Sequence, residues 1–323
     1  MIDNWGRKIE YLRVSITDRC NLRCIYCMPK DGIELIKHDE ILTFEELIRI
    51  IKSASELGIS KIRITGGEPL ARKGITQFIR KIKSIKGIEE VSITTNGILL
   101  EENIDDLIKA GLDRINVSID SLNEDIYSKI TRSKGLDKVL RGINVALDKG
   151  IKKVKINTVI AKEINYSEIM DFAELTEKMP VDVRFIELMP IGEGKKYTQV
   201  SNDDIKKIIL KKRKLIPFLN SKGSGPATYF RTLSSKGAIG FISPISHEFC
   251  NKCNRIRITP EGFLKLCLHW NDGVDLKKVL RSKASDEQLY KIIYNAIKQK
   301  PYKHEFKSQN KNSDSRNMSQ IGG

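Results

Sequence analysis

The sequence lacks any long apolar run. No stretch approaches the roughly 18 consecutive apolar residues of a membrane-spanning helix, and the first 15 residues lack the apolar core of a signal peptide. Aromatic residues make up only 7% of the chain, and no stacking platform of the kind that binds RNA is visible. We therefore expect a cytoplasmic protein that does not bind a membrane, and the few aromatic residues argue against a nucleic acid as its partner.

The length and the charge of the chain limit the number of domains and the kinds of partner that it can have. The 323 residues are enough for about two domains, and 40% hydrophobic with 30% charged residues is typical of a globular protein. The 57 Lys and Arg residues exceed the 41 Asp and Glu residues by 16. Such an excess indicates either an anionic partner or a well-solvated lysine-rich surface, and its sign alone leaves both open.

The first two thirds of the chain alternate between strand and helix patterns. Short runs rich in Val and Ile predict six buried strands, at residues 12–17, 61–65, 91–95, 114–120, 154–160 and 183–188. Helical periods lie between them, at residues 43–57, 75–85, 104–110, 136–147 and 167–179, and Thr43 and Glu46 have the spacing of a capping box. This alternation predicts parallel βαβ units in an open barrel or a doubly wound sheet, with ligands at the carboxyl ends of the strands.

The pattern changes after about residue 194. Residues 201–214 predict a basic amphipathic helix with a solvated lysine face. Two hairpins are predicted next, residues 227–233 with 238–243 and residues 255–259 with 262–266. The polar end, from about Ser308, has no period and predicts a disordered tail. These changes divide the chain into residues 1–200, residues 201–310 and a flexible tail at 311–323.

Six cysteines form two groups of three, which without a secretion signal indicate metal or redox sites rather than disulfides. Cys20, Cys24 and Cys27 follow the first predicted strand. A structural zinc needs a fourth protein ligand, and the nearest downstream histidine, His38, is eleven residues beyond Cys27. Three thiolates without an obvious fourth ligand favour an iron–sulfur cluster with one iron open to a substrate.

The second group, Cys250, Cys253 and Cys267, is compatible with either a zinc ion or an iron–sulfur cluster. His247 and His269 flank the three cysteines, and three cysteines with one histidine make a good structural zinc site. The hairpin between the last two cysteines carries Arg255 and Arg257, and their spacing points both guanidinium groups to one face. Two arginines beside a metal centre suit a bound phosphate better than a protein core.

The first group, with Tyr26 before its last cysteine, resembles the cluster motif of the radical S-adenosylmethionine (SAM) enzymes. Residues 66–69, Gly-Gly-Glu-Pro, look like that family's segment for the SAM amino group. Ser118 and Asp120 match its ribose-and-methionine position, and Met189 matches an adenine contact. The resemblance implies an α/β fold, an incomplete (β/α)6 barrel of TIM type over residues 1–200, with a 4Fe-4S cluster on Cys20, Cys24 and Cys27 and SAM bound by Tyr26, Gly67, Ser118 and Met189.

Over the whole chain from about Leu12, the motifs resemble the GTP 3′,8-cyclase family of molybdenum-cofactor (molybdopterin) biosynthesis. This implies a second 4Fe-4S cluster on Cys250, Cys253 and Cys267, in a smaller C-terminal domain that closes the barrel, with an open iron for the guanine. The implied GTP contacts are Arg13, Arg63, Thr94, Lys155, Arg255, Ile256 and Arg257, with Arg184 as a further cation. The last residues, Gly322 and Gly323, are implied to reach into the active site, since a segment without side chains fits a narrow channel.

The implied reaction is radical chemistry by a lyase. The reduced first cluster cleaves SAM, and the 5′-deoxyadenosyl radical removes the C3′ hydrogen of GTP. Attack of C3′ on C8 and reduction then give (8S)-3′,8-cyclo-7,8-dihydroguanosine 5′-triphosphate. The resemblance also implies a homodimer and a downstream cyclic pyranopterin monophosphate synthase, but it does not identify the electron donor.

Charges within the predicted strands agree with this interpretation. Arg13, Arg63, Lys155 and Arg184 each interrupt an apolar strand. A buried cation without a partner is costly, so a set that faces inward requires an anion, which a triphosphate supplies.

Two other functions stay open from the sequence. One is a peptide-modifying radical SAM maturase, although such enzymes usually carry more C-terminal cysteines. The other is a basic zinc or iron–sulfur protein that binds nucleic acid through its positive charge. About eight iron atoms per chain would support the cyclase interpretation, whereas one zinc and no iron would contradict it.

Overall fold

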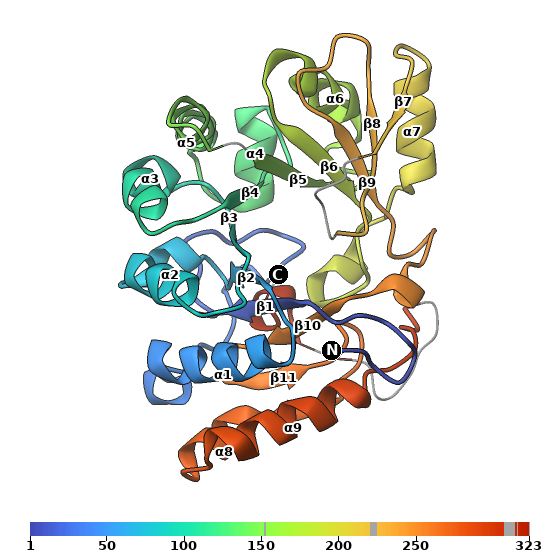
Figure 1. Cartoon of the computed structure of the whole chain (residues 1–323). Coiled ribbons are helices and arrows are strands. Elements are labelled where there is room, and N and C mark those ends of the chain that lie inside the picture. The colour runs from blue at the N-terminus through green and yellow to red at the C-terminus, as the bar shows by residue number, and fades with distance from the viewer. Residues whose placement is uncertain (152, 220–224, 307–313, 315, 323) are drawn as a thin grey trace.

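A computed structural model describes residues 1–151, 153–219, 225–306, 314 and 316–322 (Figure 1). Its centre is a row of six parallel strands that lie side by side in sequence order. They are β1 (Tyr11–Ser15), β2 (Lys61–Thr65), β3 (Glu90–Thr95), β4 (Arg114–Ser118), β5 (Val154–Val159) and β6 (Asp182–Ile186). All six predicted strands are confirmed, with ends that agree to within two residues, and the sequential order is that of an incomplete barrel rather than a doubly wound sheet.

Helices cover the outer face of these strands (Figure 1). They are α1 (Phe44–Glu56), α2 (Ile75–Lys83), α3 (Leu100–Lys109), α4 (Glu124–Thr131), α5 (Leu136–Asp148) and α6 (Ile169–Lys178). The predicted capping box is confirmed at the start of α1, where Thr43 and Glu46 each accept a backbone hydrogen bond from the other. Helix α4 was not predicted from the sequence, although the Asn123 side chain caps it by accepting from two backbone N–H groups. The apolar faces of helices and strands together form one large core.

The C-terminal third extends the same sheet at both edges. At one edge, β9 (Ile239–Ile242) lies parallel to β6 and is followed outward by β8 (Thr228–Arg231) and β7 (Ile216–Phe218). At the other, β10 (Arg255–Ile258) lies parallel to β1 and is followed by β11 (Phe263–Lys265) and β12 (Gly273–Asp275). Both predicted hairpins are therefore confirmed, and each places one of its strands against the barrel.

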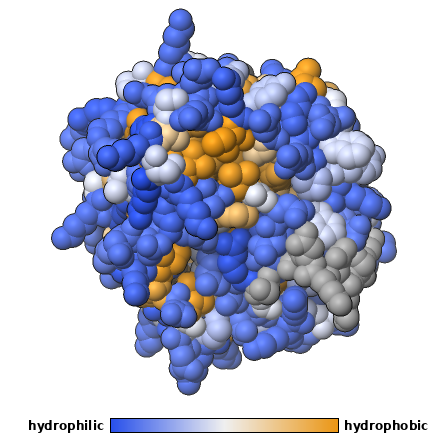
Figure 2. All heavy atoms as spheres, turned by 90° about the horizontal axis from the view of Figure 1, so that it is seen from below, coloured by the Kyte–Doolittle hydropathy of each residue, from blue (hydrophilic) through white to orange (hydrophobic). Residues whose placement is uncertain are grey.

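Three helices complete the C-terminal part. The predicted basic helix is α7 (Asn202–Leu210), shorter than expected, while α8 (Leu276–Arg281) and α9 (Asp286–Lys298) lie under α1 (Figure 1). Seen from below, the surface is mostly hydrophilic around a smaller apolar area (Figure 2). Within the part of the chain that is described, no helix has both the length and the apolarity to cross a membrane.

The chain end differs from the expectation of a disordered tail. Residues Met318–Gln320 form a short 3-10 helix, Ile321 is fully buried, and Gly322 lies against Ser15 of β1 and Thr65 of β2. Asp314 forms an ion pair with the buried Lys265. The polar composition misled the prediction because one apolar residue and one buried ion pair fix this segment. The other predicted tail residues, 311–313, 315 and 323, lie outside the described residues.

Candidate active site

One cavity of about 360 Å³ opens at the carboxyl ends of the barrel strands and brings both cysteine groups together. The predicted site residues that line it are Arg13, Cys20, Cys24, Tyr26, Cys27, Arg63, Gly67, Thr94, Ser118, Lys155, Arg184, Met189, Cys250, Cys253, Arg255, Arg257 and Cys267. Ile256 does not line it, because β10 alternates and turns that side chain into the core, where it is 1% exposed. Gly322 lies behind the lining, and Gly323 is outside the described residues.

The first cysteine group is held by an unusually close approach of two backbones. The Gly67 N–H donates to the Thr17 carbonyl over 2.7 Å, and the Glu68 N–H donates to the Arg19 carbonyl over 2.8 Å. A Cβ atom on Gly67 would lie 2.3 Å from the Arg19 carbonyl oxygen, so only glycine fits here. The Gly-Gly-Glu-Pro segment therefore fixes the chain that leads directly into Cys20.

The three thiols of this group oppose one another's ionisation. Burial, together with the charge of Cys27, raises the pKa of Cys24 well above its usual range. Burial and the charge of Cys20 raise the pKa of Cys27 to about 12, against a hydrogen bond from the Ser319 backbone N–H. Buried thiols with raised pKa values are suited to a metal centre, since its positive charge stabilises their thiolate form.

Two buried carboxyl groups lie beside this group. Glu68 accepts hydrogen bonds from the Thr95 hydroxyl over 2.8 Å and from the Asn96 N–H over 2.7 Å, yet burial raises its pKa to about 7. Asp120 accepts from the Tyr26 hydroxyl and from the Val159 N–H, and burial raises its pKa to about 6. Asp120 lines the cavity, where a cationic group would stabilise its charged form, whereas Glu68 is fully buried and does not line it.

Three arginines form a row across neighbouring strands, which we call the arginine row. Arg13 on β1 is in register with Arg63 on β2 and with Arg257 on β10. Burial and the charges of Arg257 and Arg63 lower the pKa of Arg13 well below its usual range. Burial and the charge of Arg255 lower the pKa of Arg257 to about 10. Within the described residues no carboxylate forms an ion pair with Arg63 or Arg257, so the row is suited to a polyanion.

The two remaining strand cations differ from each other. Lys155 forms an ion pair with Asp182 at 2.9 Å and donates to the Tyr229 hydroxyl over 2.7 Å. The expectation that all four strand cations require an outside anion is therefore wrong for Lys155. Arg184 donates to Asn116 over 2.6 Å, has no ion pair among the described residues, and burial lowers its pKa to about 10.

Several polar atoms around the cavity are buried without a hydrogen-bond partner in the described part of the chain. They include Thr94 Oγ1, Asn157 Oδ1, Arg184 Nε and Arg257 Nη1. Unsatisfied polar atoms are rare in protein interiors because each costs free energy. Their concentration around one cavity indicates a bound polar ligand.

The second cysteine group differs from the first in its electrostatics. The charges of Lys300 and Arg255 lower the pKa of Cys253, although burial opposes them. Arg7 fixes this corner, because its guanidinium donates to the carbonyls of Cys250 over 2.9 Å and Tyr302 over 2.8 Å. Within the second group the surroundings therefore favour the ionised form of Cys253, whereas burial raises the pKa of Cys250.

The spacing of the sulfur atoms bears on the zinc alternative. Around one zinc, thiolate sulfurs at about 2.3 Å from the metal lie roughly 3.8 Å from one another. In neither cysteine group do all three sulfurs lie within 4.8 Å of each other, so neither has the spacing of a mononuclear site. A cluster binds each thiolate to a different iron and therefore does not require the sulfurs to approach so closely. His247, a proposed fourth ligand, is exposed and pairs with Asp203 at 2.8 Å.

Some residues of the cavity were missed from the sequence. Asn157 follows Lys155 by two positions on β5, so strand alternation would have found it. Lys300, His304 and Ser319 come from loops and the chain end, where no period reveals which side chain turns inward.

Two family models match the chain, one after the other. The radical SAM superfamily model matches residues 14–176, and the model described as Molybdenum Cofactor Synthesis C matches residues 181–306. The structure also resembles crystal structures of Streptococcus suis SuiB. The structure bound to S-adenosylmethionine has a TM-score of 0.62 and 16% identity, over 90% of this chain and 68% of that one. This likeness shows the fold.

Curated relatives match over the full length. A protein of Clostridium perfringens (strain SM101 / Type A) named GTP 3′,8-cyclase is 50% identical over 324 residues, with 100% of both chains covered. Another of that name, from Desulforamulus reducens, is 47% identical over 327 residues, again with 100% of both chains covered. The fold, the family models and the first cysteine group define a radical SAM enzyme. Within that class, the chain belongs to the GTP 3′,8-cyclase family.

Proposed function

We propose that this protein converts GTP to (8S)-3′,8-cyclo-7,8-dihydroguanosine 5′-triphosphate, the first step of molybdenum-cofactor biosynthesis. The observation that carries the proposal is the arginine row, which lies in the cavity that both cysteine groups share. A triphosphate is the ligand that a row of buried guanidinium groups binds best. Full-length relatives of the same name support the assignment.

The first cysteine group and its neighbours provide the SAM half of the cavity. Cys20, Cys24 and Cys27 would hold a 4Fe-4S cluster, which when bound and reduced supplies the electron that turns SAM into a hydrogen-abstracting radical. The SAM contacts are Tyr26, Gly67, Ser118 and Met189. Gly67 allows the backbone before Cys20 to pack closely against the end of β2, and its own backbone would then meet the SAM amino group. The buried carboxyl of Glu68 supports this segment from behind, because it accepts hydrogen bonds from Thr95 and Asn96.

The opposite half of the cavity holds GTP. Arg13, Arg63 and Arg257 bind the triphosphate, and Thr94, Lys155, Arg184 and Arg255 complete the polar wall. A second 4Fe-4S cluster on Cys250, Cys253 and Cys267 would sit next to the guanine and bind it through an open iron. Of the predicted contacts, Ile256 acts through β10, which it anchors in the core so that Arg255 and Arg257 face the ligand.

The chain end meets the same cations. The Gly322 carbonyl accepts hydrogen bonds from Arg13 and from the Thr65 hydroxyl, both over 3.2 Å. A Cβ on Gly322 would lie 3.0 Å from the Ser15 Cβ, and its φ of +83° also favours glycine. These contacts support a place for Gly322 in the proposed active site, where its carbonyl orients Arg13. The same role for Gly323 stays a prediction from the family resemblance.

A test of this function starts from reconstituted protein with GTP, SAM and dithionite under anaerobic conditions. We expect 5′-deoxyadenosine and a cyclised nucleotide, both dependent on GTP. The substrate assignment is wrong if deoxyadenosine is absent or forms equally without GTP.

A variant of the second cysteine group distinguishes the roles of the two clusters. Reconstituted protein should contain about eight iron atoms per chain, for two clusters of four. Cys250→Ala should retain about four, with SAM binding unchanged and GTP turnover lost. Turnover that survives in this variant would make the second cluster structural.

Two partners follow from the proposed reaction. The product is a cyclised nucleotide that a cyclic pyranopterin monophosphate synthase consumes, and the protein is proposed to act as a homodimer. Sedimentation of the purified protein tests the second point.

A further inference from the structure

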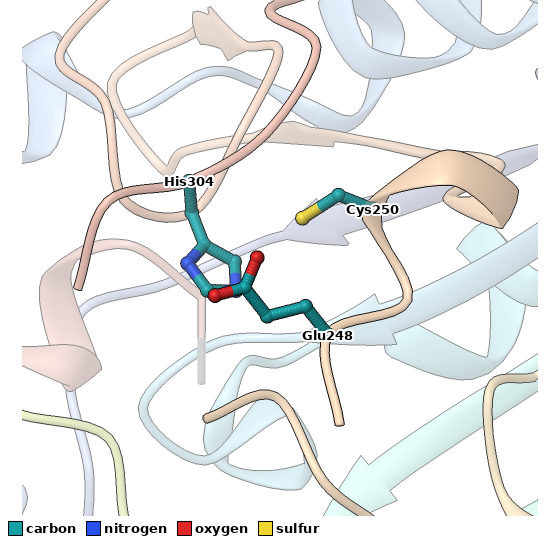
Figure 3. A group of neighbouring side chains, drawn as sticks. All are labelled: Glu248, Cys250 and His304. Carbon is teal, nitrogen blue, oxygen red and sulfur yellow. The ribbon is translucent and has the colours of Figure 1, made fainter. Parts of the chain in front are cut away.

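A third group of metal-ligand side chains lies at the edge of the second cysteine group. Ligand atoms of Glu248, Cys250 and His304 all lie within 4.8 Å of one another, a property of no other set of three such residues in the described chain. Figure 3 shows the Cys250 sulfur directed toward the His304 ring, with the Glu248 carboxylate beside the ring. Neither Glu248 nor His304 is among the ligands proposed for the second cluster.

The backbone holds these residues together. Cys250 begins the short 3-10 helix Cys250–Lys252, whereas His304 follows α9. The His304 backbone N–H is a hydrogen-bond partner of the Cys250 sulfur, and Arg7 binds the carbonyls of Cys250 and Tyr302. The two segments are thus fixed side by side before any ion binds, which lowers the entropy cost of binding.

The surroundings fit a metal site of limited access. His304 is 9% exposed, whereas Glu248 is exposed and gives an ion a path from solvent. The ring of His269 lies 6.4 Å from that of His304, and its buried Nε2 atom has no partner among the described residues. Ligand atoms around one ion stand roughly 3–4 Å apart, so a small closure of this group suffices to bind it.

We propose that Glu248, Cys250 and His304 form a site for a single divalent transition-metal ion. One thiolate, one imidazole and one carboxylate form the mixed donor set that borderline ions such as Zn²⁺, Co²⁺ and Fe²⁺ accept, and hard ions such as Mg²⁺ do not favour it. Three protein ligands leave a further position to water. Because the site uses Cys250, an ion in it excludes that thiolate from the second cluster. This last consequence, unlike the site itself, rests on the proposed function.

Cobalt tests the site directly, because a thiolate bound to Co²⁺ gives a charge-transfer absorption band. The protein is the cluster-free full-length chain with Cys20, Cys24 and Cys27 all replaced by Ala, so that the first group cannot contribute. We expect one Co²⁺ per chain with a band of one thiolate. Cys250→Ala should abolish the band, and Glu248→Gln and His304→Ala should each weaken binding at least tenfold.

Cys253→Ala and Cys267→Ala are the matched controls, since they remove the other thiols of the second group and should leave Co²⁺ affinity unchanged. If either weakens binding as much as Cys250→Ala, the cysteine group holds the ion and the proposal is wrong. Unchanged binding in both Glu248→Gln and His304→Ala would also overturn it. Glu248 is exposed, so its variant tests the site without a risk to folding.

Zinc tests the competition with the second cluster. Wild-type protein that is given one equivalent of Zn²⁺ before reconstitution should take up about four iron atoms instead of eight, and His304→Ala should take up eight in either case. Iron uptake that Zn²⁺ leaves unchanged would contradict the exclusion. If wild-type protein binds only four iron atoms without zinc, the proposed second cluster fails, while the Co²⁺ result still decides the mixed-ligand site.

Discussion

Both the stability and the function of the protein depend on individual buried charged residues. Arg257 has Arg13 beside it in register, and its pKa is lowered to about 10 by burial and by Arg255. We expect Arg257→Gln to raise the thermal midpoint of the ligand-free protein, because like charges no longer face each other. Calorimetric titration should show GTP affinity reduced at least tenfold, since a hydrogen bond to a charged group contributes about 1.5–3 kcal/mol, with SAM affinity unchanged. A lower midpoint with unchanged GTP affinity would mean that Arg257 is structural.

The raised pKa of Glu68 predicts that the free energy of unfolding depends on pH. Its pKa is raised from 4.5 in the unfolded chain to about 7 in the fold, so the folded protein binds the proton more tightly. The free energy of unfolding should therefore fall as pH rises from about 4.5 to about 7, and Asp120 acts in the same direction. Thermal midpoints without SAM should show a shallower fall in Glu68→Gln than in wild type. The exposed Glu163→Gln should match wild type, and equal slopes in all three proteins would contradict this account.

Sequence reasoning at the level of single residues succeeded where a motif or a period gave the position. The cysteines, Gly67 and Met189 came from motifs, and the arginines on β1, β2 and β10 came from charges inside apolar runs. It failed for Lys155 because the sequence does not show that Asp182 lies across from it on the neighbouring strand. It missed His304 because a loop residue has no period.

At the level of elements, the chain end depends on one ion pair with β11. Burial alone would raise the pKa of Asp314, but hydrogen bonds from Arg316 and Lys265 hold it at about 2. The Lys265 side chain is 0% exposed, and Arg316 also binds Glu261 at 2.7 Å. Because the depressed pKa contributes stability above about pH 4 and loses it only toward pH 2, this anchor is intact at neutral pH.

We therefore expect Asp314→Asn to release the tail. Backbone hydrogen exchange at residues 316–322 should become at least tenfold faster, and formation of the cyclised nucleotide should fall while SAM still binds. Asp137→Asn, which breaks an exposed pair with Arg141, is the control and should change neither measurement. Unchanged exchange in the Asp314 variant would show that the tail is held elsewhere.

Elements with local signals were predictable, and pairings between distant segments were not. Capping and helical period located α1, and a capping box of Ser285 and Gln288 likewise marks the start of α9. Nothing local indicates that β9 joins β6 or that β10 joins β1. Those contacts depend on the three-dimensional closure of the sheet.

At the scale of the whole molecule, the predicted boundary near residue 200 does not separate two independent sheets. Residues 1–200 alone would leave both β1 and β6 without the neighbours that β10 and β9 provide. Exposed edges of apolar strands aggregate. We expect a chain truncated after residue 200 to be insoluble or to lack a cooperative thermal transition, as size-exclusion chromatography and calorimetry would show. A monomeric, cooperatively melting fragment would contradict this expectation.

The arginine row also links ligand capture to the completion of the fold. β10 lies far from β1 in the sequence. When β10 pairs with β1, Arg257 comes to lie alongside Arg13, which already repels Arg63 on the other side. An anion that binds all three arginines stabilises the joined state and has little affinity for the separated strands. The nucleotide is therefore expected to act as a folding ligand for its own binding site, so that the cellular supply of the nucleotide influences how much of the protein has a closed sheet.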